Sequence, residues 1–324
     1  MRIWKNLNTI HNSLLTKVHK ADSREIFMEG VFQLSRLVDS TNPEATLNEV
    51  IHLAVSMKPD LSESLFVESF RDIQKLYAGA YPGYQACNTY YHDFRHTMMV
   101  LLAMVRLMHG ASLQGVRFSE KEINLGLISA LMHDTGYIQS IDDLRGTGAK
   151  YTLVHTQRSI QFIENYFVGN PYFNGEMKNF RDIVSCTEFN TTIDDQAFHS
   201  ENIALLGKML GTADLLGQMA DRLYLEKLLL LYEEFTEGGV PGFDSEIDLF
   251  RKTVSFYKRT KSRFENEYGN VNRFMNHHFK ERWNIDGNVY EDSIEKNINY
   301  LKFVLKDSRK NITDILRRNA VSLQ

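Results

Sequence analysis

The stretch SEKEINLGLISALMHD, from Ser119 to Asp134, carries the signals that decide the fold. Ser119 followed three residues later by Glu122 is the capping-box pattern that begins a helix. Apolar residues then recur at helical spacing until the chain reaches a His-Asp pair. We therefore predict a buried helix that ends at His133 and Asp134.

The same helical periodicity dominates the rest of the chain, and no set of alternating runs would build a sheet. We expect an all-α fold, a helical bundle with additional helices at both ends. Ser62–Ala80 is predicted as an amphipathic helix, and the following helix is expected to begin near Tyr90. The glycine-rich stretch 236–246 is the clearest break in the chain. The expected parts are an N-terminal helical region (1–82), a core (83–240) and a C-terminal helical region packed on the core (241–324).

The composition indicates a folded globular protein, because 43% of the 324 residues are apolar. Acids and bases are interleaved, with a net charge of -4, so the basic footprint of a nucleic-acid-binding protein is missing. No apolar run reaches the length of a signal peptide or a membrane span. Cys87 and Cys186 are too few for a disulfide framework. We expect a soluble cytoplasmic protein without a membrane or nucleic-acid partner, and we leave open a homodimer.

The stretch YYHDFRHTMMV, from Tyr90 to Val100, places His92 and His96 four residues apart. After His96, apolar residues follow at spacings of three and four, which predicts that His96 points into the core. These apolar residues are Met99, Val100, Ala103 and Leu107.

Asp214 interrupts the apolar helical stretch LLGKMLGTADLLGQM. A carboxylate in such a helix is expensive unless it is paired or binds a cation. Gly207, Gly211 and Gly217 lie on its own face, where each costs about 1 kcal/mol relative to alanine. This bare face predicts the close approach of another backbone or of a ligand.

Four polar residues thus stand at the inner face or end of apolar helices, namely His96, His133, Asp134 and Asp214. Two neutral imidazoles and two carboxylates balance the charge of a divalent ion. Mixed nitrogen and oxygen ligands suit Fe, Mn, Zn, Co or Ni better than an all-oxygen site would, and Mg is kept as an alternative. An open coordination position would hold a water whose pKa the ion lowers.

The order His, then His-Asp, then Asp resembles the HD superfamily of metal-dependent phosphohydrolases over residues 90–235. The opening motif also resembles the Y-H-N-x-x-H pattern of cyclic-nucleotide phosphodiesterases, with Asp93 in place of the asparagine. The resemblance implies an all-helical enzyme in which His96 binds the metal and His92 is the general acid that protonates the leaving oxygen. It also implies that a hydroxide formed at the metal attacks phosphorus, with Asp134 or Asp214 orienting the attacking water.

The motifs for a second metal are incomplete. Where phosphodiesterases continue H-D-x-x-H, this chain has Tyr137, and where the HD-GYP branch has H-D-I-G-K, it keeps only Gly136. His155 matches the next histidine of that branch, but its later His-His pair is absent. One metal ion is therefore expected, with His155 as a residue for a second metal or for phosphate. Arg145 and Lys150, which flank the GTG stretch, are further candidates to contact phosphate.

The resemblance and the residues together predict a metal-dependent phosphohydrolase that acts on a small-molecule phosphoester, specifically a nucleotide. A cyclic-nucleotide phosphodiesterase is the favoured subtype. One alternative is hydrolysis of a nucleoside phosphate or a guanosine alarmone at the same site. Another is a regulatory HD domain that senses a ligand without catalysis.

Overall fold

The structure, a computed structural model, describes residues 33–189, 193 and 198–306. Over these residues the chain forms twelve α-helices and no strand, which confirms the expected all-α fold. Residues 1–32 and 307–324 of the predicted terminal helical regions lie outside the described residues. The helices are α2 (Leu34–Leu37), α3 (Pro43–Met57), α4 (Ser64–Tyr77), α5 (Phe94–Leu113), α6 (Glu120–Met132), α7 (His155–Tyr166), α8 (Met177–Ser185), α9 (Glu201–Met219), α10 (Tyr224–Glu237), α11 (Glu246–Asn266), α12 (Phe274–Trp283) and α13 (Val289–Lys306). Short 3-10 helices are η1 (Thr135–Tyr137), η2 (Gly148–Tyr151), η3 (Pro171–Phe173) and η5 (Val271–Arg273).

The chain divides into two compact units, residues 1–39 and 40–324. In the first unit the structure describes α2. The second unit contains α3 to α13 and all the residues that the sequence marks as a site.

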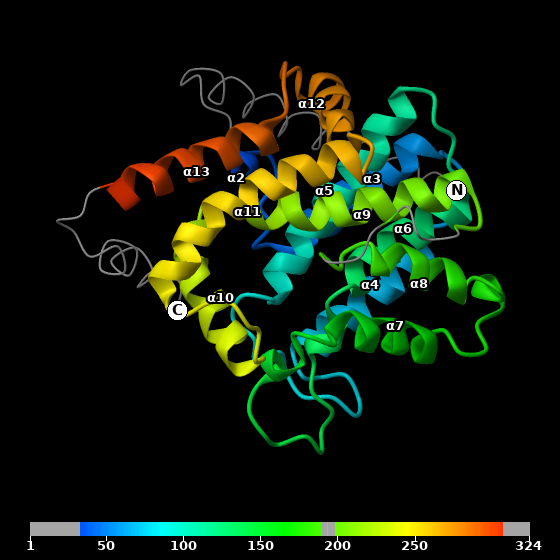
Figure 1. Ribbon diagram of the computed structural model, residues 1–324. Helices are drawn as coiled ribbons and strands as arrows, with labels where there is room; N and C mark the ends of the chain where they lie inside the picture. Colours follow the sequence, from blue (N-terminus) through cyan, green and yellow to red (C-terminus); the bar gives the residue numbers. More distant parts are fainter. Residues whose placement is uncertain (1–32, 190–192, 194–197, 307–324) are drawn as a thin grey trace. The chain divides into compact units, whose positions relative to one another are not determined.

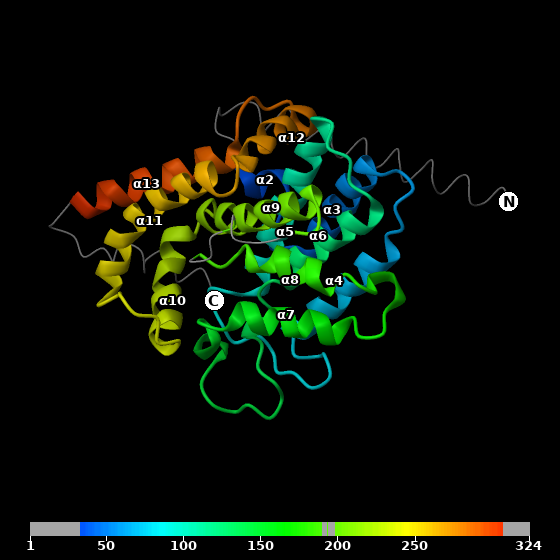
Figure 2. The same ribbon diagram turned by 45° about the vertical axis from the view of Figure 1, so that its right-hand side comes forward.

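Helix α5 forms the centre of the second unit. It packs against α3, α6, α9 and α12, so helices from both terminal parts of the chain touch it directly (Figures 1 and 2). Among the described helices α5 has the length and apolarity to cross a membrane, but 83% of that window is buried inside the fold. Its hydrophobicity is accounted for by its place in the core.

Side-chain caps fix where the site helices begin. Asp93 is the N-cap of α5, and its Oδ1 accepts a hydrogen bond of 2.8 Å from the backbone N–H of His96. The helix therefore starts at Phe94, later than the position near Tyr90 that the periodicity predicted, and His92 lies outside it. Ser119 and Glu122 form the expected capping box of α6.

The apolar stretch that contains Asp214 continues to Phe235 in the sequence, and the structure divides it into α9 and α10. Asn297 of α13 donates hydrogen bonds of 2.9 and 2.8 Å to the backbone carbonyls of Met219 and Asp221, at the break between the two helices. The first bond satisfies a carbonyl that the end of α9 leaves without a helical partner, and the second adds to the bond that Asp221 accepts from the backbone N–H of Tyr224. The break lets α10 turn away from α9, which brings its Glu234 to the site described below.

Candidate metal centre

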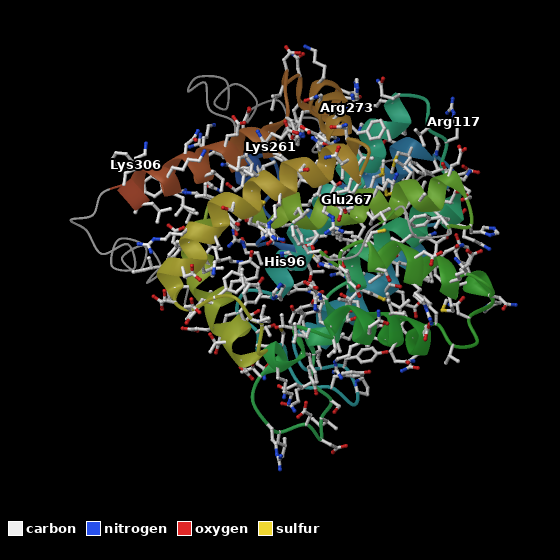
Figure 3. The ribbon with its side chains drawn as sticks, in the orientation of Figure 1. His96, Arg117, Lys261, Glu267, Arg273 and Lys306 are labelled. Atoms are coloured by element: carbon white, nitrogen blue, oxygen red, sulfur yellow. The ribbon has the colours of Figure 1, made fainter. Side chains whose placement is uncertain are left out.

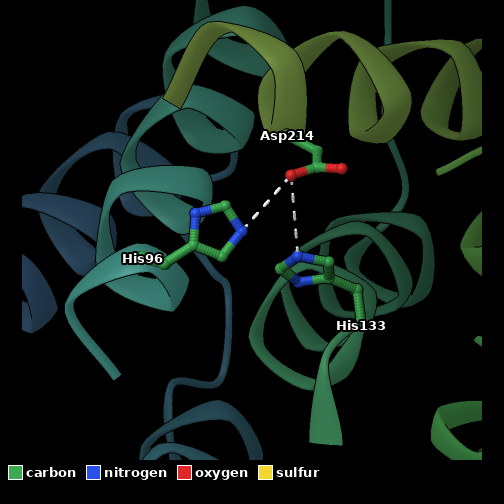
Figure 4. Close-up of side chains that lie close together, drawn as sticks. All are labelled: His96, His133 and Asp214. Atoms are coloured by element: carbon green, nitrogen blue, oxygen red, sulfur yellow. Dashed lines mark ion pairs between the residues drawn. The ribbon is translucent and has the colours of Figure 1, made fainter. Parts of the chain in front are cut away.

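Three helices bring His96, His133 and Asp214 together. Their ligand atoms lie within 4.8 Å of one another, an arrangement that could hold a metal ion. His96 reaches in from α5, His133 from the end of α6 and Asp214 from α9, and the Asp214 carboxylate faces both imidazoles (Figure 4). Asp214 Oδ1 is 3.3 Å from His96 Nε2 and 3.9 Å from His133 Nε2.

Asp134, the fourth predicted ligand, lies against the same two histidines. Its Oδ2 is 3.3 Å from His96 Nε2 and 3.2 Å from His133 Nε2. His133 Nδ1 lies 2.9 Å from the carbonyl oxygen of Ala130, which fixes the proton on Nδ1 and leaves Nε2 as the ligand atom. The four residues predicted from the sequence therefore converge in the structure.

The ligand atoms are buried without hydrogen-bond partners. His96, His133 and Asp134 are 2%, 1% and 3% exposed, and His96 Nε2, His133 Nε2 and Asp134 Oδ2 are left without a well-aligned partner among the described residues. Buried polar atoms are nearly always hydrogen-bonded, so three atoms that face one another without a hydrogen bond need an explanation. The donor set, two imidazoles and two carboxylates, fits a divalent transition metal.

The electrostatics of the site favour a cation. Burial disfavours the charged form of His96, but the adjacent carboxylates of Asp134 and Asp214 outweigh it and raise the pKa of His96 to about 10. Burial also disfavours a charged His133, and the carboxylates of Asp134 and Asp214 again outweigh it, so the pKa of His133 is raised. Burial would raise the pKa of Asp134, yet the neighbouring His133 and His96 hold it well below its usual value. A proton on His96 thus balances part of the negative charge of the two carboxylates.

The glycines of α9 admit protein neighbours on two sides. A Cβ at Gly217 would lie 3.2 Å from the backbone nitrogen of Val100, so this glycine lets α9 lie close to α5. A Cβ at Gly211 would meet the Tyr268 hydroxyl and the Cys186 carbonyl oxygen at 2.3 and 2.5 Å. The close approach predicted from the bare face is therefore that of backbone and a tyrosine.

His92 lies beside the metal ligands, held by a carboxylate that the sequence did not single out. Its Nδ1 is 2.6 Å from Glu234 Oε2, and the other Glu234 oxygen accepts a 2.7 Å hydrogen bond from the backbone N–H of Tyr91. Glu234 is buried at 4% exposure on α10. Because 142 residues separate the pair, no local pattern could have revealed it.

Tyr137 and His155 complete the wall of the site. The ring of Tyr137 stacks on His92 and on His155, with centroid distances of 4.4 and 4.6 Å. His155 is the first residue of α7, and its Nε2 lies 3.7 Å from Asp134 Oδ1, the oxygen that faces away from the orphaned group. The two oxygens of Asp134 therefore lie beside different histidines: Oδ2 beside His96 and His133, and Oδ1 beside His155.

The two basic residues that flank the GTG stretch, Arg145 and Lys150, lie in different surroundings. Lys150 forms a 2.5 Å ion pair with Asp143 and also donates to the backbone carbonyl of Arg145. Arg145 itself is exposed. The Lys150 charge thus stabilises the loop, and neither side chain has a described contact with the four ligands.

A further buried charge network adjoins the start of α5. Arg95 donates to Asp221 at 2.9 Å, and Lys227 Nζ lies 3.7 Å from Asp93 and 3.8 Å from Asp221. Lys227 and Asp221 are 5% and 6% exposed. This network joins α5 and α10, the elements that carry His96 and Glu234. Sequence reasoning missed it, although charged residues in an apolar helix such as α10 are a signal of pairing.

Comparison with known families matches residues 143–270 to the family described as Npun_R2479-like. The matched part is less than half of the chain. It contains His155, Asp214 and Glu234 but not the helices that carry His96 and His133. No curated protein matches the chain.

Proposed function

We propose that this protein is a metal-dependent phosphohydrolase of the HD type that cleaves a nucleotide phosphoester, with cyclic nucleotides as the favoured substrates. The observation that carries the proposal is the set of orphaned, mutually facing atoms of His96, His133 and Asp134, with Asp214 beside them. These atoms lie 3.2 to 3.9 Å apart as ion pairs but are not aligned for hydrogen bonds, which supports a role as metal ligands.

A divalent ion bound by these four residues would supply Lewis-acid chemistry and lower the pKa of a coordinated water. His96 and His133 would each give Nε2, and Asp134 and Asp214 would each give one oxygen. Their positions on two helices and at the end of a third make the site rigid, which favours metal binding without rearrangement.

His92 is assigned as the general acid. Glu234 engages Nδ1 at 2.6 Å, which leaves Nε2 to transfer a proton to the departing oxygen. Glu234 also fixes the ring orientation, because its second oxygen is held by the Tyr91 backbone.

His155 is assigned as a contact for the phosphate or for a second ion. Its Nδ1 lies 2.7 Å from the Thr152 carbonyl oxygen, so Nε2 faces Asp134. Burial lowers the pKa of His155, which favours the neutral imidazole able to act as a ligand.

The test combines elemental analysis with a substrate panel. Purified protein should carry a stoichiometric transition metal, and His96→Ala and Asp214→Ala should lose both metal and hydrolysis. The exposed His52→Ala is the matched control and should retain both. A wild type that binds no divalent metal under any loading condition would end the proposal.

The same panel separates the alternatives. A cyclic diester gives a monoester without free phosphate, whereas nucleoside phosphates release phosphate or pyrophosphate and an alarmone releases pyrophosphate. A metal-replete protein that hydrolyses none of them, and loses only metal in Asp134→Ala, would indicate the regulatory HD domain instead.

A further inference from the structure

A second set of unsatisfied polar atoms lies at the other end of α5. Arg106, ten residues beyond His96, is 1% exposed. Its Nη1 donates a 2.8 Å hydrogen bond to the Tyr290 hydroxyl, but Nε and Nη2 have no hydrogen-bond partner among the described residues. Ten helical residues correspond to roughly 15 Å, so these atoms are separate from the metal ligands.

No carboxylate in the described part of the chain pairs with Arg106. The buried acid Glu49 is paired with Arg282 instead, through two hydrogen bonds of 3.1 and 3.2 Å. Glu281 is more than half exposed and lies 3.7 Å from His109. A guanidinium cannot give up its proton in a protein, so Arg106 remains a buried cation.

Aromatic rings compensate for only part of this charge. The guanidinium carbon lies 5.9 Å from the Phe279 ring centroid and 5.7 Å from that of Tyr290. Such distances are at the outer limit of cation–π attraction, which in any case does not satisfy N–H donors.

His278 adds a third unsatisfied atom on α12, next in the chain to Phe279, whose ring faces the Arg106 guanidinium. His278 is fully buried, and its Nδ1 lies 3.2 Å from Nδ1 of His109. Its Nε2 has no partner among the described residues. Burial and then the positive charge of Arg106 hold the pKa of His278 well below its usual value, so the ring is neutral. If Nδ1 accepts from His109, Nε2 carries the proton and is a donor.

We propose that Arg106 and His278 bind a small monovalent anion, with chloride as the ion tested. Two buried guanidinium N–H groups without acceptors suit an anion, and His278 Nε2 supplies a third donor in the tautomer in which Nδ1 accepts from His109. One guanidinium balances one negative charge. A doubly charged phosphate would leave an excess negative charge in a buried site. The ion would neutralise the interior where α5 meets α12 and α13.

The experiment compares thermal unfolding of the full-length protein in sodium chloride and in sodium gluconate at equal ionic strength. Because screening is the same, a specific ion should raise Tm by a few degrees in chloride, with saturation as chloride is titrated. Bromide should substitute for chloride. Arg106→Met should abolish the difference, whereas Arg117→Met, which alters an exposed arginine (Figure 3), should preserve it.

A wild-type Tm that is equal in the two salts would overturn the anion site. So would an Arg106→Met protein that keeps the chloride effect. If that variant does not fold, His278→Leu serves in its place and should weaken the chloride dependence by removing one donor.

Discussion

The phenol ring of Tyr137 stacks on the imidazole ring of His92, with centroids 4.4 Å apart and planes 13° from parallel. Tyr137 is 2% exposed, and Arg158 anchors its segment by donating to the carbonyls of Gly136 and Ile138 at 2.7 and 3.1 Å. The tyrosine that departs from the motifs this sequence resembles therefore packs against His92. It holds the ring that we assign as the acid.

Replacing Tyr137 with leucine should lower kcat for a cyclic nucleotide by about 100-fold, because a misplaced catalytic ring loses its alignment. Tyr137→Phe keeps the stacking face and should stay within a few-fold of wild type. Metal content, measured in parallel, should be unchanged in both variants. Equal activity of the leucine and phenylalanine variants would rule out a positioning role for the ring.

Removal of the proposed acid, in His92→Ala, should reduce kcat for a cyclic nucleotide by about 10² to 10⁴-fold without loss of metal. Glu234→Gln should reduce it less, since the ring remains. An aryl phosphodiester whose leaving group needs no protonation should be hydrolysed nearly as well by His92→Ala as by wild type. If the aryl substrate suffers the same loss, His92 acts in some way other than proton donation.

The stability of the metal-free protein should fall as pH rises through about 10. The pKa of His96 is raised from 6.5 to about 10 in the folded state, so its contribution is complete below pH 6.5 and is lost above that folded pKa. Metal affinity should change in the opposite direction, rising with pH, because the ion displaces protons from His96 and His133. Chemical denaturation and metal titration at several pH values measure the two trends. A metal affinity independent of pH would contradict the proton–metal competition.

Gly136→Ala should destabilise the protein by about 1 to 3 kcal/mol or more, because the new Cβ would lie 1.9 Å from the carbonyl oxygen of His155. Gly126→Ala is the matched control. Its Cβ would meet only flexible side-chain ends at 2.9 to 3.1 Å, and it gains helix propensity within α6. Urea unfolding of the two variants compares these effects, and equal stabilities would contradict the tight packing of η1 on α7.

The helical fold and the four residues of the candidate metal centre could be predicted because their signals are local. The capping box at Ser119 and Glu122 fixes the start of α6, and its apolar periodicity leads to His133. The spacing after His96 predicted its burial, since side chains three and four residues apart share a helix face.

What the sequence determined alone was the all-α class and the inward direction of residues such as His96 and His133, because both depend on neighbours within a few turns. The tertiary structure alone decided that α5 starts after His92 and that Glu234 meets His92 across 142 residues. It also decided that Tyr137 stacks between two imidazoles. These relationships arise where separate helices pack, and a contact between distant segments leaves no periodic trace in either one.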